Sequence, residues 1–306
     1  KGKPFNTLLI QGVLVQAVLI ILQQEVRHLD IYNKGAFMLY KKILSLMAVL
    51  IAVVMFADIA TAKSGPPLDI LVAGYGWYRG IPEGQTNNAE LVAMALDGEM
   101  IRAKDENGKV VGLGKVHSIA IPVTWDGAFP PVEEAINEIN PDIILGLGTA
   151  GDMRVEPWGS NVMWGCDANP DDPDDQLCME GQPIDDSLGA PDYLMGSLPY
   201  DEIVLAMLAN GIPVWRGHKT EYRDVVNYED EEVSLPRATP GWYLCNYLTY
   251  KLPMYVENND LDATVGFIHI ATRPEYRAEF RLKQLLEADT MEEYDDIVER
   301  SIGYSL

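Results

Sequence analysis

The chain of 306 residues carries 23 Lys and Arg against 46 Asp and Glu, which gives a formal net charge of −23. This acidity excludes nucleic acid as the expected partner, because phosphate binding needs clustered cations. Apolar residues make up 48% of the chain and charged residues 23%, which excludes a disordered protein and is typical of a globular one. The three cysteines are too few for a disulfide scaffold and lack zinc-ligand spacing, so no metal site is predicted.

The first predicted element is a secretory signal peptide over residues 38–62. Met38 and the two lysines at 41 and 42 supply a positive start, an apolar run covers Ile43–Ala57, and Ala60-Thr61-Ala62 is a small-x-small cleavage motif. The apolar run is shorter than the roughly 20 residues of a bilayer span, which favours cleavage over the alternative of an uncleaved anchor. The sequence thus predicts an exported protein (extracellular, periplasmic or cell-surface) that meets a membrane only through its N-terminal segment before cleavage.

Residues 1–37 precede this signal, which normally stands at the start of a chain. We expect Met38 to be the true start and the preceding stretch to be an over-extended reading of the gene. The alternative is a membrane helix over Leu8–Leu22. The mature domain is then predicted to cover residues 63–306.

The mature chain alternates short apolar runs with amphipathic segments. Strands are predicted at Leu68–Ala73, Val116–Val123, Ile143–Leu147, Ile212–Trp215 and Ala263–Ile270. Helices are predicted at Asn88–Leu96, Pro131–Ile139, Tyr200–Ala209 and Gly241–Lys251, with one or two more over Arg273–Ser301. This alternation indicates a single α/β domain, a three-layer α/β/α sandwich around a mostly parallel, mixed central sheet.

A glycine-rich segment, Gly146–Gly151, has the spacing of a dinucleotide-binding fingerprint and follows a predicted strand. That fingerprint works by placing a pyrophosphate at a helix N-terminus. The residues from Asp152 to Pro157 do not open a convincing helix, so a nucleotide site is not favoured and no cofactor is predicted. The glycines are instead expected to let the chain turn tightly.

The loop from Cys166 to Cys178 contains five aspartates. Two cysteines in an exported protein usually pair, which predicts a Cys166–Cys178 disulfide. The aspartates could hold Ca²⁺ through oxygen ligands, but Asp172 stands where an EF-hand loop needs glycine, so a solvated acidic loop is favoured.

This pairing leaves Cys245 as the odd cysteine, one turn inside the predicted helix. A helix N-terminus favours the thiolate form of cysteine, which is the nucleophile. His269 closes the strand that starts near Ala263, and Glu156 follows the strand that starts at Ile143, so both stand at strand ends, where reactive groups gather in an α/β sheet. Taken singly, the three residues could be a core cysteine, a structural histidine and a surface carboxylate; together they are a candidate Cys-His-Glu triad.

These segments resemble the pyroglutamyl peptidase I (pyrrolidone-carboxylate peptidase) family of cysteine peptidases, from about Leu68 to Ala271. Gly241–Asn246 is similar to the family motif G-x-(Y/F)-x-C-N, and Gly266–His269 is similar to G-F-(I/L)-H. Glu156 with Asn161 matches E-x4-N. Weaker similarities are found at Asp69–Gly80, Pro141–Gly151 and Pro183–Asp185.

The resemblance implies removal of an N-terminal pyroglutamyl residue from a peptide, without metal or organic cofactor. Cys245 would be the nucleophile, His269 the base and Glu156 the residue that orients the imidazole. The substrate-binding side chains would be Tyr75, Tyr78, Tyr243 and Asn87.

The sequence also departs from the family pattern. The family's arginine, ten residues after the catalytic glutamate, is replaced by Cys166, and residues His218–Pro236 add an acidic, polar insert before the cysteine segment. The alternative function is therefore a catalytically weak or inactive cell-surface or envelope protein that uses the same fold for assembly, as a homo-oligomer or surface array. A third hypothesis is a related peptidase or amidase that acts on another blocked N-terminus.

Overall fold

The computed structural model describes residues 66–78, 86–104, 110–151, 153–167, 176–209, 214–220, 224–228 and 231–271. The predicted signal peptide, residues 1–37, the loop aspartates of 171–175 and the helices expected over Arg273–Ser301 lie outside the described residues. Within the described residues, no helix has both the length and the apolar character needed to span a membrane.

A seven-stranded mixed sheet forms the centre of the molecule, in the order β10-β5-β13-β4-β1-β3-β2. Its four central strands run parallel: β13 (Thr264–Ala271), β4 (Ile143–Ala150), β1 (Leu68–Tyr75) and β3 (Val110–Ile121). The edges are mixed, because β2 (Met100–Lys104) is antiparallel to β3 and β5 (Arg154–Glu156) is antiparallel to β13, while β10 (Trp215–Arg216) is parallel to β5. The near-continuous burial of β1, β4 and β13 is what a sheet covered on both faces requires.

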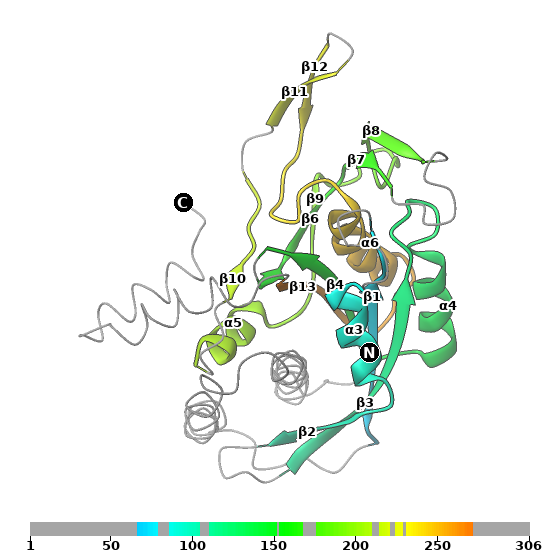
Figure 1. Ribbon diagram of the computed structural model, residues 1–306, viewed down its shortest axis with the longest axis vertical. Coiled ribbons are helices and arrows are strands. Elements are labelled where there is room, and N and C mark those ends of the chain that lie inside the picture. Colours follow the sequence, from blue (N-terminus) through cyan, green and yellow to red (C-terminus); the bar gives the residue numbers. More distant parts are fainter. Residues whose placement is uncertain are drawn as a thin grey trace, which may run out of the picture.

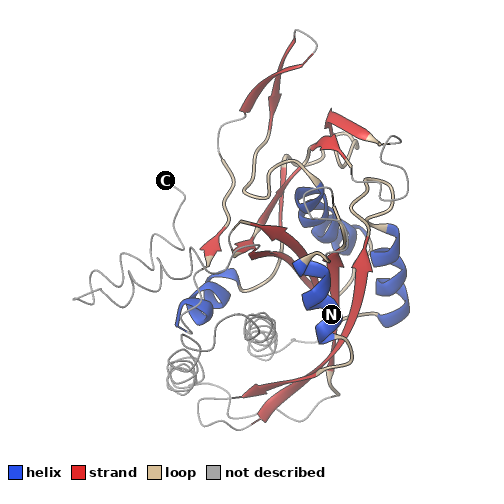
Figure 2. Ribbon diagram, in the orientation of Figure 1, coloured by secondary structure: helices blue, strands red, loops and turns tan. Residues whose placement is uncertain are grey.

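Helices cover both faces of this sheet (Figures 1 and 2). Side chains of α3 (Asn88–Leu96) and α5 (Tyr200–Ala209) pack with Ile70 and Val72 in one core cluster. Side chains of α4 (Pro130–Ile139) and α6 (Leu244–Asn258) pack with Leu71 and Ala73 in the other. Alternate residues of β1 thus point to opposite layers, and the predicted three-layer α/β fold is confirmed.

Three small two-stranded antiparallel sheets lie outside the central sheet, and the second and third of them are hairpins. They are formed by β6 (Trp158–Ser160) with β9 (Tyr193–Met195), β7 (Met163–Cys166) with β8 (Cys178–Gln182), and β11 (Asp224–Tyr228) with β12 (Glu231–Leu235). The β11–β12 hairpin occupies most of the insert noted at His218–Pro236, and Figure 1 shows it extending away from the central sheet.

Most predicted elements occur close to their expected bounds. Of the strand expected at Ile212–Trp215, residues 212 and 213 lie outside the described residues, and β10 covers only Trp215–Arg216. Two other elements differ for identifiable reasons. The helix expected from Gly241 begins at Leu244, because Gly241 adopts a positive φ of 82° that a right-handed helix cannot contain. The strand expected over Val116–Val123 starts earlier, at Val110, and ends at Ile121, before a proline that cannot donate to the ladder.

Candidate active site

Strand register brings two of the three candidate catalytic residues to one place. His269 is the partner of Gly148 on β4, and Phe267 is the partner of Glu156 on β5. Because side chains two apart on a strand share a face, Glu156 and His269 both point toward the layer that contains α6. The first turn of α6 supplies Cys245 on the same side.

A buried ion-pair geometry joins the histidine to the carboxylate. His269 Nδ1 lies 2.9 Å from Glu156 Oε1, and the two residues are 4% and 0% exposed. A Cβ on Gly217 would overlap with Glu156 Oε2, so the absence of a side chain at Gly217 leaves room for the second carboxylate oxygen. With Nδ1 engaged, Nε2 is the imidazole nitrogen left to interact with Cys245.

The Cys245 side chain hydrogen-bonds with His269 and is half-buried. A Cβ built on Gly148 would lie 2.8 Å from Cys245 Sγ and 3.2 Å from His269 Cδ2. Gly148 therefore makes room for the sulfur and the imidazole side by side. Our prediction of a tight glycine turn here was wrong, because Gly146 and Gly148 lie within β4 and their open faces receive the Phe267 ring, Leu248 and the sulfur.

The electrostatics of the site favour a charged imidazole. Burial alone lowers the pKa of His269, but the charge of Cys245, its hydrogen bond and the contact with Glu156 outweigh burial and raise that pKa from 6.5 to about 10. At neutral pH His269 is thus an imidazolium that lies between a carboxylate and a sulfur. This arrangement is the resting form expected of a thiolate-imidazolium pair.

The N-terminus of α6 adds to the positive field at the sulfur. Tyr243 is the N-cap residue, and the first turn contains no acidic side chain that would oppose the helix dipole. The first-turn N–H groups of a helix have no partner within the helix, so they are available to an anion beside Cys245. Burial, then Cys245, raises the pKa of Tyr75, whose hydroxyl stays protonated and donates to the Leu244 carbonyl at 2.6 Å.

The predicted substrate-binding residues lie in different environments. Tyr75 is 2% exposed and tethers α6 through the bond just described, whereas Tyr78 and Tyr243 are partly exposed and pack against the same core cluster. Asn87 is buried and caps α3, accepting from Ala89 N–H and from the Thr149 hydroxyl and donating to the Gly76 carbonyl at 2.7 Å. Asn87 thereby ties the carboxyl ends of β1 and β4 together.

Asn246, next to the candidate nucleophile, holds α6 against the segment that follows Glu156. It is fully buried, and its amide accepts from the Ser160 N–H at 2.8 Å and hydroxyl at 3.0 Å. The same amide donates to the carbonyls of Ser160, at 2.8 Å, and Val162, at 2.9 Å. The asparagine that follows the cysteine in the motif therefore has a structural role, which is to hold α6 against the segment from Ser160 to Val162.

Asn246→Ala is expected to lower the free energy of unfolding by roughly 2–5 kcal/mol, because it leaves buried backbone groups of Ser160 and Val162 without partners. Urea denaturation measures the change. Asn258→Ala, at the exposed end of the same helix, is the control and should cost no more than about 0.5 kcal/mol. Equal costs for the two variants would contradict this role.

Two further residues near the site were not identified from the sequence. Trp125 packs edge-on against Tyr243, and Asp167 is 3% exposed and accepts a hydrogen bond from the Trp125 N–H. An aromatic residue shortly after the end of a strand was an available signal for Trp125, whereas Asp167 looked like one more member of an acidic loop. The predicted disulfide between Cys166 and Cys178 is present beside them. The described residues contain no group of three or more His, Cys, Asp or Glu side chains placed to hold a metal ion.

The family model and the individual relatives that match this chain all belong to the same group of peptidases. Residues 68–218 match the model of the pyroglutamyl peptidase family; Cys245 and His269 lie beyond this segment. The chain is 31% identical over 168 residues to pyrrolidone-carboxylate peptidase 1 of Caldanaerobacter subterraneus subsp. tengcongensis, covering 53% of this chain and 68% of the relative. It is 32% identical over 193 residues to pyrrolidone-carboxylate peptidase of Brevibacillus brevis, covering 59% and 76%.

The fold is also similar to solved structures. The crystal structure of pyroglutamyl peptidase I from Bacillus amyloliquefaciens superposes with a TM-score of 0.51 at 20% sequence identity, over 76% of this chain and 94% of that one. At this identity the likeness shows a shared fold.

Proposed function

The chain belongs to the pyroglutamyl peptidase family, and on this basis we propose that it is a cysteine peptidase that removes an N-terminal pyroglutamyl residue from peptides through Cys245, His269 and Glu156. The observation that carries the proposal is the buried hydrogen bond between His269 and Glu156, with the Cys245 sulfur and the imidazole side by side over Gly148.

In the proposed acylation step, the Cys245 thiolate attacks the carbonyl carbon of the pyroglutamyl residue and forms a thioester through a tetrahedral intermediate. First-turn N–H groups of α6 stabilise the oxyanion, in place of the arginine that the family pattern expects where Cys166 stands. The His269 imidazolium donates its proton to the leaving amine, and Glu156 keeps the ring oriented and its charge paired.

In the proposed deacylation step, the neutral imidazole takes a proton from water, and the resulting hydroxide equivalent attacks the thioester carbonyl. The C–S bond breaks, pyroglutamate leaves, and the thiolate-imidazolium pair is restored. Tyr78 and Tyr243 are proposed to contact the apolar edge of the lactam ring, with Asn87 and Tyr75 supporting the loop and helix around it.

Hydrolysis of a fluorogenic pyroglutamyl amide by the purified protein tests the proposal. We expect the protein to hydrolyse the pyroglutamyl amide but not the corresponding alanyl or prolyl amide. Iodoacetamide should abolish this hydrolysis. Turnover of a different N-terminal group would favour a related amidase, and large ordered assemblies without turnover would favour the structural alternative; either result would overturn the proposal.

The pH dependence provides a separate prediction. Because acylation needs the imidazolium as acid, kcat/KM should fall as pH rises through about 10, the raised pKa of His269. Alkylation of Cys245 by iodoacetamide needs only the thiolate and should not fall over the same range. A parallel decline of both rates would contradict this assignment.

The same shift predicts a trend in stability. Folding favours protonated His269, so its contribution is complete below pH 6.5 and is lost as pH rises through about 10. Thermal unfolding followed from pH 6 to 10 checks this, with His269→Gln as the control that should lose less stability over that range.

We also propose that the protein is exported by a signal peptide over residues 38–62. Support comes from the order of charged, apolar and small-residue segments there and from the Cys166–Cys178 disulfide, which is typical of oxidising compartments. N-terminal sequencing of protein recovered outside the cytoplasm should begin at Lys63. Retention of the whole chain inside the cell would contradict it.

A further inference from the structure

A hairpin closed by the disulfide lies against the segment that leads into Cys245. In β7 the Trp164 N–H donates to the Trp242 carbonyl at 2.8 Å. The next residue, Gly165, has a φ of 106°, and a Cβ there would lie 3.3 Å from the ring of Tyr243. The hairpin and the entrance of α6 are therefore in direct contact, by a backbone bond and by a close approach that only glycine allows without strain.

Trp125 contacts both this hairpin and α6. Its indole Nε1–H donates to the Gly165 carbonyl at 2.9 Å. Its ring is edge-on to Tyr243, with centroids 5.5 Å apart, and to Tyr247, with centroids 6.0 Å apart. Such edge contacts favour one orientation of each ring. The ring of Tyr243 is thus held between Trp125 and the backbone of Gly165.

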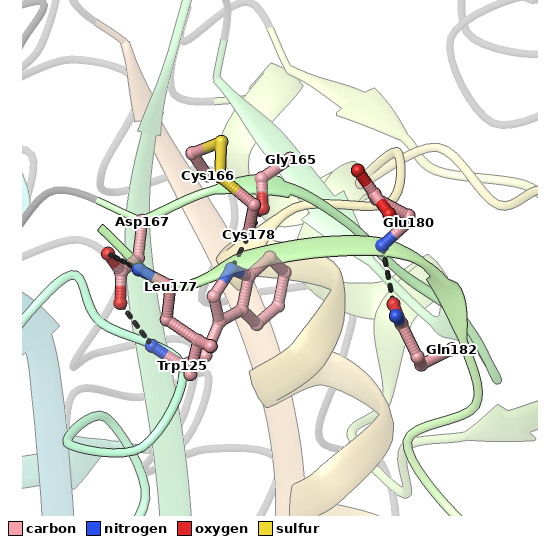
Figure 3. Close-up of a disulfide and its surroundings, with 8 residues drawn as sticks. All are labelled: Trp125, Gly165, Cys166, Asp167, Leu177, Cys178, Glu180 and Gln182. Atoms are coloured by element: carbon pink, nitrogen blue, oxygen red, sulfur yellow. Dashed lines mark hydrogen bonds between the residues drawn. A yellow bond between two sulfur atoms is a disulfide. The ribbon is translucent and has the colours of Figure 1, made fainter. Parts of the chain in front are cut away.

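Asp167 locks Trp125 to the hairpin (Figure 3). One carboxylate oxygen accepts from the Trp125 N–H at 3.2 Å and the other from the Leu177 N–H at 3.1 Å, while the Asp167 N–H donates to the Leu177 carbonyl at 3.0 Å. Asp167 is 3% exposed and takes no part in the proposed chemistry. A buried carboxylate is costly unless it is hydrogen-bonded, and this one is bound on both oxygens by backbone amides of two separate segments.

We propose that Asp167 and Trp125 are positioning residues that, together with the Cys166–Cys178 disulfide, form a clamp on Tyr243. The clamp joins the loop after β3, the β7–β8 hairpin and the N-cap of α6. It fixes the ring that contacts the pyroglutamyl group, and it does not touch the pair formed by His269 and Glu156. The inference rests on the proposed function and adds to it what determines substrate affinity.

The test compares Asp167→Asn, Asp167→Ala, Trp125→Phe and the double variant Cys166→Ser with Cys178→Ser. Asparagine keeps one acceptor of two, and phenylalanine keeps the ring but loses the indole bond. The control is Asp126→Ala, an exposed aspartate in the same loop as Trp125. Circular dichroism establishes which variants fold, and kcat and KM are measured on the fluorogenic pyroglutamyl amide.

We expect KM to rise about tenfold or more in Asp167→Ala and by a smaller factor in Asp167→Asn and Trp125→Phe, with kcat within about threefold and the alkaline limb of the pH profile unchanged. The disulfide variant should resemble Asp167→Asn, and the control should stay within twofold of wild type. A folded Asp167→Asn or Trp125→Phe with unchanged KM, or a fall in kcat alone, would overturn the proposal. Should Asp167→Ala not fold, these two milder variants decide.

A second measurement separates this proposal from the peptidase assignment. The rate at which iodoacetamide alkylates Cys245, and its slowing by free pyroglutamate, are read in every variant without any turnover. If the wild-type protein binds pyroglutamate but does not hydrolyse the amide, the proposed function is wrong. The clamp can still be tested in that case, because the alkylation assay needs no turnover. If free pyroglutamate slows the alkylation of Cys245 equally in wild type and in the folded clamp variants, the proposed clamp is wrong.

Discussion

Replacing Cys245 with alanine is expected to reduce hydrolysis of the pyroglutamyl amide by a factor on the order of 10⁴ or more, because no other group in the proposed mechanism can form the acyl-enzyme. The substitution removes one half-buried sulfur from the first turn of α6, so the fold should persist. Initial rates at high enzyme concentration measure the loss, and circular dichroism with thermal unfolding shows that the protein is intact.

A second substitution at the same position sharpens this result. Cys245→Ser keeps the shape of the side chain at a slightly smaller size but presents a hydroxyl that is far less ionised than a thiol, so it should be nearly as inactive. The disulfide cysteines are not expected to substitute for Cys245, because both sulfurs are engaged with each other. If Cys245→Ala retains more than about a tenth of the wild-type turnover, the assignment of Cys245 as the nucleophile is wrong.

The second large effect is expected at Glu156. Glu156→Gln retains an oxygen that can accept from His269 Nδ1 but removes the buried charge that faces the imidazolium. The expected loss in kcat is about 10²–10⁴-fold, as for the removal of the corresponding charge in other triads. The pKa of His269 should also fall, so the alkaline limb of the kcat/KM profile should move to lower pH.

The control for this variant is Glu134→Gln, a neutralised carboxylate on the exposed face of α4. It should leave the rate and the pH profile as they are. Should Glu156→Gln retain the wild-type alkaline limb, the carboxylate would not contribute to the raised pKa of His269, and this role of Glu156 would be wrong.

The central fold was predictable because its signals are local. The runs at Leu68 and Ile143 are uniformly apolar, as strands covered on both faces must be, and the helix from Pro131 carries its own start signals. The short strands were not predictable in the same way. β5 has three residues, and its place beside β13 is set by pairing with residues more than a hundred positions away, which no local pattern records.

The residues of the candidate site also differ in whether a local sequence pattern indicates them. Cys245 lies in the first turn of a predicted helix and His269 near the end of a predicted strand, so local patterns point to both. Glu156 was expected just after the Ile143 strand, but it ends the separate strand β5, so its place beside His269 follows from long-range pairing. Asp167 and Trp125 could not be found in this way, because their importance depends on contacts between a loop, a hairpin and a helix. Composition suggested that Asp167 was solvated, and only its burial shows otherwise.

The insert that carries β11 and β12 leaves and rejoins the body at neighbouring points. Thr239 N–H donates to the His218 carbonyl at 2.8 Å, and Thr220 N–H donates to the Arg237 carbonyl at 2.9 Å. A loop whose two ends already meet can lengthen between them at a small entropic cost, because the cost of closing a loop grows slowly with its length. Insertions, deletions or replacements between these two points are therefore expected to be tolerated, even though the proposed nucleophile, Cys245, follows only a few residues later.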